Sequence, residues 1–209
     1  MKQCSLCHAP VHLFKTYKKV AYYHCHTCDA IQLDPEFYLS ASEEKGRYLL
    51  HHNDPEHLGY RQFVASLLQE ILANQTTDQV GLDYGSGTEP VISILLKEHQ
   101  YEVKNYDPYF NPDKSRLTNQ YDYIICCEVM EHFYTPATEF ERLYFLLKPG
   151  GTLYCKTLLW KPETDFDSWW YKNDPTHVFF YSENTLQWIQ KQWSFKNLQL
   201  VNEVILLRK

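Results

Sequence analysis

Hydrophobic residues in the second half of the chain form short runs that alternate with longer amphipathic stretches. The short runs predict strands, and the stretches with apolar positions every three to four residues predict helices. The predicted strands are 80–83, 102–106, 122–127 and 152–158, and the predicted helices are 89–99, 136–147 and 182–193. Strands that alternate with helices predict a mostly parallel sheet covered by helices on both faces.

The first seventy-six residues have a different pattern. Two short runs rich in β-branched and aromatic residues, 11–14 and 20–23, predict a hairpin. An acid-rich segment at 40–44 begins a helix, and a second helix runs from Tyr60 to Leu72. We therefore expect a small segment at 1–38 and a larger domain at 39–209, in which residues 39–76 precede the sheet.

Length and composition narrow the class of protein. A chain of 209 residues holds one full domain and a small appendage. With 44% hydrophobic residues it can bury a core, which excludes collagen-like and disordered classes. The apolar runs are far shorter than the ~18 residues of a membrane span, and the first five residues lack the apolar core of a signal peptide. We therefore expect a cytoplasmic protein with no membrane partner.

Four of the seven cysteines form two C-x2-C pairs separated by seventeen residues: Cys4, Cys7, Cys25 and Cys28. This spacing is typical of a structural zinc site, in which four thiolates close a tetrahedron around the ion. Two disulfides or a redox-active pair are the less favoured alternatives, and one of the nearby histidines could replace a cysteine. The segment resembles a zinc ribbon. The residues that follow the two pairs, His8 and Asp29, tolerate the left-handed backbone that such a knuckle needs.

Charge is distributed unevenly along the chain. The net charge is −6, but the first thirty-three residues hold four lysines against one aspartate. A solvated hairpin is the favoured explanation, and a small basic surface that contacts nucleic acid is the alternative.

A glycine-containing loop follows the first predicted strand of the sheet. Gly85 and Gly87 lie between this strand and a helix, at the sheet edge where such folds bind ligands. Asp107 ends the next strand, where an acid accepts hydrogen bonds from ribose hydroxyls. A dinucleotide site is disfavoured because Pro90 occupies the position of the third glycine, and no Gly-Lys-Ser or Gly-Lys-Thr of a Walker loop is present.

In these residues the chain resembles the class I S-adenosylmethionine-dependent methyltransferases. The matching segments are the loop 82–88, Asn105-Tyr106-Asp107, the strand 121–132 with its trailing Glu-His, and 147–151. The resemblance implies an α/β Rossmann-like fold, a mostly parallel seven-stranded sheet whose closing strand is antiparallel. It assigns 197–201 and 204–208 to the closing hairpin, and S-adenosylmethionine to the cofactor site.

The resemblance also implies roles for individual residues. The cofactor-binding residues would be Asp83, Tyr84, Gly85, Gly87, Asp107, Cys127 and Glu128. Cys127 and Glu128 would lie beneath the sulfonium, and Asp107 would bind the ribose. The helices within 39–76 would form a lid, which makes His51 and Asn53 candidate pocket residues. The interval between Asp107 and Tyr121 departs from the family pattern, so we assign no adenine-contacting acid.

Methyl transfer from a sulfonium is an in-line displacement, so catalysis depends mainly on holding the acceptor atom next to the methyl carbon. An oxygen acceptor also needs a base. His132 and His177 are the candidate bases, with Asp174 orienting His177. Both histidines could instead be packed residues that bond to backbone carbonyls. Trp170 and Tyr171 are of a type that more often anchors a core or a loop than stacks on a ligand, but their density favours a pocket for a flat acceptor over an open phosphate groove.

The sequence thus predicts a methyltransferase that acts on a small molecule at oxygen, nitrogen or carbon. One alternative is an RNA or protein methyltransferase that docks its substrate through the zinc-ribbon-like segment. The other is a noncatalytic binding module that has the cofactor fold.

Overall fold

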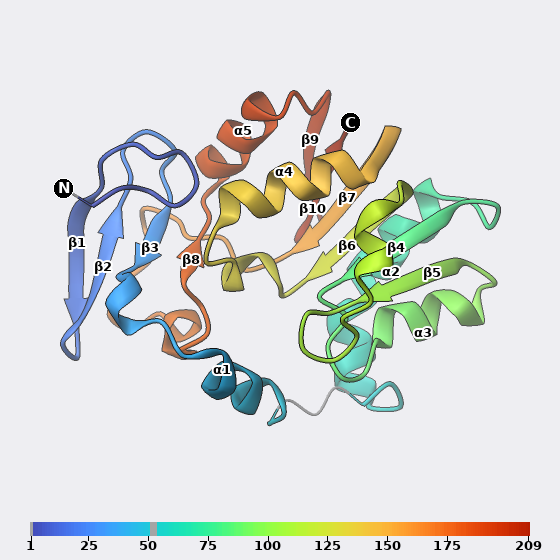
Figure 1. The fold of residues 1–209 in the computed structure, drawn as a ribbon, viewed down its shortest axis with the longest axis horizontal. Coiled ribbons are helices and arrows are strands. Elements are labelled where there is room, and N and C mark those ends of the chain that lie inside the picture. The colour runs from blue at the N-terminus through green and yellow to red at the C-terminus, as the bar shows by residue number, and fades with distance from the viewer. Residues whose placement is uncertain (1, 51–53) are drawn as a thin grey trace.

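A six-stranded sheet forms the centre of the computed structural model, which describes residues 2–50 and 54–209 (Figure 1). In spatial order its strands are β5 (Glu102–Tyr106), β4 (Val80–Tyr84), β6 (Tyr121–Cys127), β7 (Leu147–Lys156), β10 (Val204–Arg208) and β9 (Asn197–Val201). The first four run parallel, and β10 is antiparallel to both of its neighbours. The predicted parallel sheet and its antiparallel closing hairpin are confirmed.

The expected seventh strand is absent from the described sheet, so the prediction of seven strands is wrong by one. The strand would have to form between Asp107 and Tyr121, an interval of thirteen residues. A parallel crossover alone takes about a dozen residues. Pro108 and Pro112 further restrict this interval, which forms only the short 3-10 helix η2 (Lys114–Thr118).

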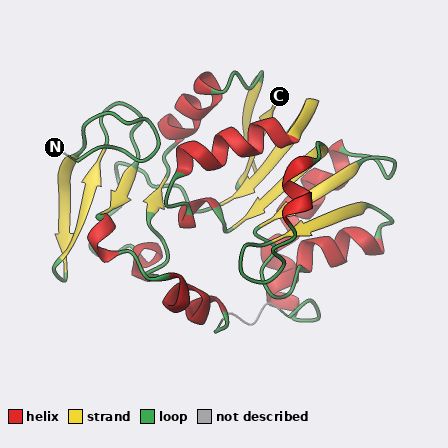
Figure 2. Cartoon of the chain, viewed as in Figure 1, coloured by secondary structure: helices red, strands yellow, loops and turns green. Residues whose placement is uncertain are grey.

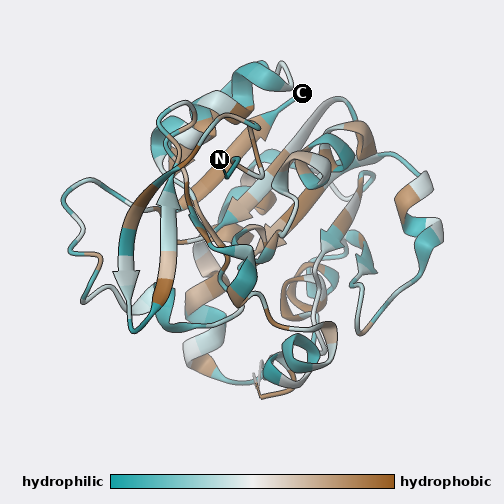
Figure 3. Ribbon diagram, turned by 60° about the vertical axis from the view of Figure 1, so that its left-hand side comes forward, coloured by the Kyte–Doolittle hydropathy of each residue, from teal (hydrophilic) through white to brown (hydrophobic). Residues whose placement is uncertain are grey.

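Helices cover both faces of the sheet (Figure 2). They are α2 (Leu58–Asn74) and α3 (Val91–Glu98) on one face, and α4 (Pro136–Leu146) and α5 (Glu183–Gln192) on the other. Successive residues of a strand point to opposite faces. Tyr123 and Ile125 of β6 therefore pack with α2 and α3, while Ile124 and Cys126 pack with α4 and α5. Figure 3 shows the resulting pattern, with hydrophobic strands inside and hydrophilic outer helix surfaces.

The N-terminal segment forms a second, antiparallel sheet at one end of the molecule (Figure 1). Its strands are β1 (His12–Tyr17), β2 (Val20–His24), β3 (Ile31–Leu33) and β8 (Phe179–Phe180). The predicted hairpin is confirmed as β1 and β2. Because β8 comes from the larger part of the chain, backbone hydrogen bonds join the two parts, and Leu33 N donates to Val178 O over 2.8 Å. Leu6 and Phe140 belong to one continuous hydrophobic cluster.

Helix α1 (Ala41–Tyr48) does not pack on either face of the large sheet. It begins at Ser40, whose side chain and that of Glu43 cap each other's backbone amides. The short 3-10 helices η1 (Pro35–Phe37), η3 (Met130–His132) and η4 (Trp170–Asn173) complete the helical elements of the described chain. None of the helices within residues 2–50 and 54–209 is long and apolar enough to cross a membrane.

The packing of β4 against β6 generates a test of the fold. Gly81 of β4 is paired with Tyr123, and a Cβ atom at this glycine would overlap the tyrosine ring. We expect Gly81→Ala to lower the free energy of unfolding by about 1–3 kcal/mol, measured by urea denaturation. Gly46→Ala is the matched control, because a Cβ on this exposed α1 glycine meets nothing within 4 Å. It should be neutral or stabilising by up to ~1 kcal/mol. Equal stability of the Gly81 variant and the wild type would contradict the β4–β6 packing.

Candidate functional site

A cavity of about 880 Å³ opens at the carboxyl ends of β4, β5 and β6. Helix α1 and the segment 170–177 complete its wall. Twelve residues that the sequence predicts for the site line this cavity: Asp83, Tyr84, Gly85, Gly87, Asp107, Cys127, Glu128, His132, Trp170, Tyr171, Asp174 and His177. The other two candidates, His51 and Asn53, lie outside the described residues. Residues up to 136 positions apart in the sequence therefore share one pocket.

The glycine loop has the left-handed backbone that glycine adopts more readily than any other residue. Gly85 has a φ of 82° and Gly87 a φ of 66°. The amides of Gly85 and Ser86 donate to Tyr106 O over 2.8 and 3.1 Å, which fixes the loop to the end of β5. A Cβ on Gly85 would come within 2.6 Å of the Val129 side chain, whereas a Cβ on Gly87 would meet nothing within 4 Å. The loop is packed on one side and open on the other.

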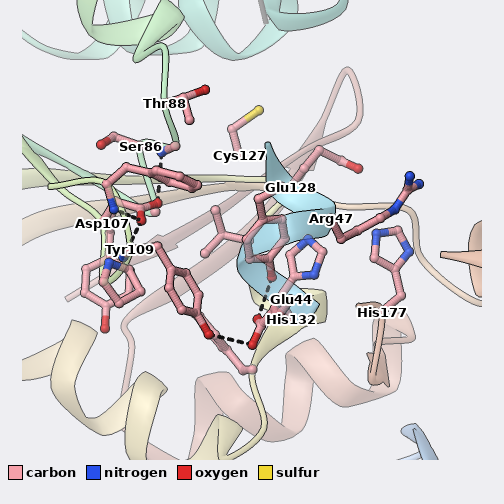
Figure 4. A pocket seen from close by; sticks show the side chains of 18 of the residues that line it. Glu44, Arg47, Ser86, Thr88, Asp107, Tyr109, Cys127, Glu128, His132 and His177 are labelled. Carbon is pink, nitrogen blue, oxygen red and sulfur yellow. Dashed lines mark hydrogen bonds between the residues drawn. The ribbon is translucent and has the colours of Figure 1, made fainter. Parts of the chain in front are cut away.

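Asp107 joins this loop to the turn that follows β5 (Figure 4). Its Oδ2 accepts a hydrogen bond from Gly87 N at 2.9 Å, and its Oδ1 accepts from the amides of Tyr109 and Phe110 at 2.8 and 3.0 Å. The side chain is buried, with 7% of the residue exposed. A carboxylate has about four lone-pair positions. The three bonds to described residues leave one for a hydroxyl in the cavity.

Asp83 and Tyr84, at the end of β4, hold the helices on either face. The Ser93 hydroxyl of α3 lies 2.9 Å from Asp83 Oδ2, and burial raises the pKa of Asp83 to about 7. The Tyr84 hydroxyl donates to Glu139 of α4 and accepts from Arg142 over 2.9 Å. Both residues thus line the cavity and also fix the strand end to its neighbouring helices.

Two neighbouring carboxylates follow β6, of which Glu131 is buried and Glu128 is partly buried. The Tyr171 hydroxyl lies 2.6 Å from Glu131 Oε1 and 3.1 Å from Glu128 Oε2, and Thr157 Oγ1 is 2.9 Å away. Burial, aided by the nearby Glu131 carboxylate, raises the pKa of Glu128 to about 8. Burial also raises the pKa of Glu131 to about 7. Tyr171 is 2% exposed and fixed by these bonds, whereas Trp170 is 67% exposed at the rim.

The two candidate bases lie side by side, with ring centroids 4.9 Å apart (Figure 4). His132 Nδ1 is 2.9 Å from Thr176 O, and His177 Nδ1 is 2.7 Å from Tyr171 O. Because a carbonyl oxygen only accepts, each Nδ1 carries the proton, and in the neutral ring Nε2 is the basic atom. His177 Nδ1 thus bonds to the Tyr171 carbonyl, and the Asp174 carboxylate accepts from Arg47 and from the Thr176 hydroxyl. An orienting role of Asp174 towards His177 stays a prediction.

Helix α1 is attached to both sides of the cavity. Glu44 Oε2 accepts from the Tyr109 hydroxyl at 2.7 Å, beside Asp107 (Figure 4). Arg47 donates to Asp174 Oδ2 over 2.7 and 3.2 Å, beside His177.

The sequence analysis missed Glu44, Arg47, Tyr109 and Glu131 as cavity-related residues. The spacing of Glu44 and Arg47 places them on one face of α1. No local pattern pairs Glu44 with Tyr109, which lies 65 positions away. Glu131 belongs to the Glu-His dipeptide that follows the strand, in which the sequence predicts a role only for His132.

The four paired cysteines lie together in the two turns that precede β1 and β3 of the N-terminal sheet. Cys4 Sγ is 3.6 Å from Cys28 Sγ, and Cys7 Sγ is 3.3 Å from Cys25 Sγ. A tetrahedron with Zn–S bonds of ~2.3 Å has sulfurs ~3.8 Å apart, so the four thiols are close enough together to share one four-coordinate ion. The residues after the pairs, His8 and Asp29, both have a φ of 60°, as the sequence predicts for the knuckles.

Comparison with known proteins agrees with the geometry of the cavity at the ends of β4, β5 and β6. A family model described as a methyltransferase domain matches residues 56–200. The chain belongs to the methyltransferase domain family. The predicted class I S-adenosylmethionine-dependent methyltransferase is thereby confirmed at the level of family and fold.

Individual relatives of this methyltransferase are distant. The ubiquinone biosynthesis O-methyltransferase of Acinetobacter baylyi is 30% identical over 101 residues, which are 47% of this chain and 42% of the relative. The chain thus matches less than half the length of this curated relative.

Two solved structures share the fold. The Haemonchus contortus phosphoethanolamine N-methyltransferase 2 with bound S-adenosylmethionine has a TM-score of 0.58 at 17% identity, covering 81% of this chain and 47% of that one. The Burkholderia thailandensis 1,6-didemethyltoxoflavin-N1-methyltransferase, with bound 1,6-didemethyltoxoflavin and S-adenosylhomocysteine, has a TM-score of 0.53 at 14% identity. The superposition covers 96% of this chain and 99% of the Burkholderia thailandensis chain.

The bond between Arg47 and Asp174 generates a prediction about α1. Arg47→Met removes the charge and keeps an apolar stem, so we expect α1 to open more often. An ion pair of this exposure contributes up to about 1 kcal/mol, so amide exchange in 41–48 should rise by about fivefold, measured by hydrogen–deuterium exchange. Asp174→Asn should have the same effect, and the double variant should exchange no faster than either. Additive effects would show that the two side chains act independently of each other.

Proposed function

We propose that the chain transfers the methyl group of S-adenosylmethionine to a small-molecule acceptor inside the 880 Å³ cavity. The observation that carries this proposal is the Gly87–Asp107 pair at the carboxyl ends of β4 and β5. It presents an open glycine loop and a buried carboxylate with an unused lone pair at the edge where parallel sheets bind nucleosides. Charge supports the same cofactor. The described lining holds seven carboxylates and one guanidinium, and the cofactor brings a cationic sulfonium and ammonium.

In this proposal, each strand end contributes to one part of the cofactor. Gly85 and Gly87 approach the methionine portion, and Asp107 accepts a hydrogen bond from the ribose. Cys127 and Glu128, at the end of β6, lie next to the sulfonium. Asp83 and Tyr84 fix the end of β4 through α3 and α4, and contact the cofactor from that side.

The acceptor occupies the half of the cavity lined by α1 and the segment 170–177. The methyl carbon leaves sulfur as it bonds to the acceptor atom, and the electron pair of the broken bond stays on sulfur to give S-adenosylhomocysteine. An acceptor hydroxyl must also lose its proton, and Nε2 of His177 or His132 is the base. The bonds from Nδ1 to Tyr171 O and Thr176 O hold both rings in position for this role.

The choice of a small acceptor rests on two observations. The cavity is covered by α1 through Glu44 and Arg47, which suits a molecule that can be enclosed. The curated relative is named as a ubiquinone biosynthesis O-methyltransferase, which supports an oxygen acceptor on a small molecule.

We further propose that Cys4, Cys7, Cys25 and Cys28 bind a structural Zn²⁺ ion, which would crosslink the segment 1–38 and leave the methyl transfer to the domain 39–209. Thiolates persist in a reducing compartment, which agrees with the expected cytoplasmic location. Through the β3–β8 pairing, this segment also supports the chain that carries His177.

Docking of RNA or protein through the N-terminal segment is less favoured. Lys2 is paired with Asp34, and Lys15 with Asp167, so two of its four lysines are already neutralised by neighbouring acids. A noncatalytic module would not need an open glycine loop joined to a buried aspartate.

The proposed cofactor site predicts a specific loss in affinity. Asp107→Asn removes the negative charge and one acceptor atom, so binding of S-adenosylmethionine should weaken by about 1–3 kcal/mol in calorimetric titration. Asp113→Asn is the matched control, because this exposed aspartate caps a turn in the same interval and does not line the cavity. It should bind the cofactor like the wild type. Unchanged affinity in the Asp107 variant would refute the ribose assignment.

The proposed zinc site predicts an effect on the acceptor side only. Cys25→Ser should lower the zinc content and increase hydrogen exchange in 170–180, because β3 no longer holds β8 firmly. Binding of S-adenosylmethionine should stay within about threefold of the wild type, since the glycine loop lies on other strands. The control is Cys155→Ala, a buried cysteine of β7 outside the cluster, which should keep its zinc. Full zinc content in the Cys25 variant would contradict the assignment.

A further inference from the structure

Three side chains that can bind a metal converge beside the acceptor half of the cavity. Glu131 and His132 come from η3, and His177 comes from the segment before β8. One ligand atom of each lies within 4.8 Å of the ligand atoms of the other two. Glu131 Oε1 is 4.0 Å from His132 Nε2. None of the three belongs to the cysteine cluster.

The histidines are held in the way that metal-binding histidines usually are. A metal-ligating imidazole typically donates its second ring N–H to a carboxylate or a backbone carbonyl, which fixes the tautomer and the ring plane. His132 and His177 both do this through Nδ1, to Thr176 O and Tyr171 O. Nε2 is then the atom that each ring offers as a ligand.

Glu131 provides an independent observation. The residue is completely buried, and its Oε1 accepts the Tyr171 hydroxyl. Its Oε2 is also buried, and among the described residues it has no hydrogen-bond partner. A buried carboxylate oxygen without a donor is unfavourable, and a bound cation would compensate its charge. Packing of the two histidines alone does not explain why an acid is placed here.

We propose that Glu131, His132 and His177 bind a divalent first-row transition-metal cation. Two imidazoles and one carboxylate suit such an ion better than Mg²⁺ or Ca²⁺, which prefer ligand sets made of oxygen. The three protein ligands leave coordination positions for water or for an oxygen of the acceptor. This last role rests on the proposed function, in which a cation would lower the pKa of a coordinated hydroxyl.

Titration with Mn²⁺ tests the site directly. MnCl₂ is added to the full chain loaded with a single zinc ion per chain, which the four thiolates take up, and the free Mn²⁺ signal is followed by electron paramagnetic resonance. Mn²⁺ is the weakest binder of the divalent series and disfavours sulfur ligands, so it does not displace zinc from the cysteines. We expect a saturable loss of the free signal that corresponds to one ion per chain. A free signal that rises in proportion to the added Mn²⁺ would overturn the proposal.

Variants assign the binding to these residues. Glu131→Gln and His177→Ala should each raise the dissociation constant of Mn²⁺ by at least about tenfold. Glu44→Gln is the matched control, because it replaces another buried carboxylate of the same cavity that also accepts a tyrosine hydroxyl. It should bind Mn²⁺ like the wild type. If Glu131→Gln fails to fold, the dissociation constant of Mn²⁺ for His177→Ala decides whether these residues form the site. Wild-type affinity in a folded variant of either residue would contradict the site.

Binding of S-adenosylmethionine separates this proposal from the proposed function. Calorimetric titration of the same samples reports on the cofactor site without a metal readout. A chain that binds the cofactor but no Mn²⁺ refutes only the metal site. A chain that binds Mn²⁺ but no cofactor refutes only the methyltransferase proposal.

Discussion

The hydrogen bond from the Gly87 amide to the Asp107 carboxylate joins the ends of β4 and β5, and the shape of the cavity depends on it. The same carboxylate also accepts the amides of Tyr109 and Phe110, so a single buried side chain fixes two loops. Parallel strands bring such ends to one edge of the sheet, and burial makes the bonds difficult to replace with water. A rigid cofactor side follows from this arrangement.

The acceptor side has a different construction. It is assembled from α1 and from the segment 170–177, which β8 connects to the N-terminal sheet. Individual long-range bonds, such as Arg47 to Asp174, hold these parts together. Such contacts open more easily than a sheet, which suits a surface that must admit an acceptor and release a product. The molecule thus places its stable elements under the cofactor and its less stable elements around the acceptor.

Local patterns predict much of this molecule, because the buried side chains of a strand or a helix produce a regular spacing of hydrophobic residues in the sequence. The sequence therefore predicts the central strands, the Gly85–Gly87 loop and the left-handed residues at His8 and Asp29. A pairing such as Glu44 with Tyr109 depends on how distant segments meet, and no periodicity records it. The family resemblance implies a seventh strand between Asp107 and Tyr121, and this prediction was wrong. The thirteen residues of that interval are too few for both a crossover and a strand. The bond between Arg47 and Asp174, which lie 127 positions apart, shows the same limit.

The central claim is that the nucleoside cofactor lies across the ends of β4, β5 and β6, beneath α1. Hydrogen–deuterium exchange of the wild-type chain with and without S-adenosylhomocysteine tests it most directly. The account predicts that the product protects amides in 84–88, 107–110 and 127–129, and those of α1 as the helix closes over the occupied cavity. Saturating S-adenosylhomocysteine that leaves these segments unprotected, or that protects a different surface, would contradict the account.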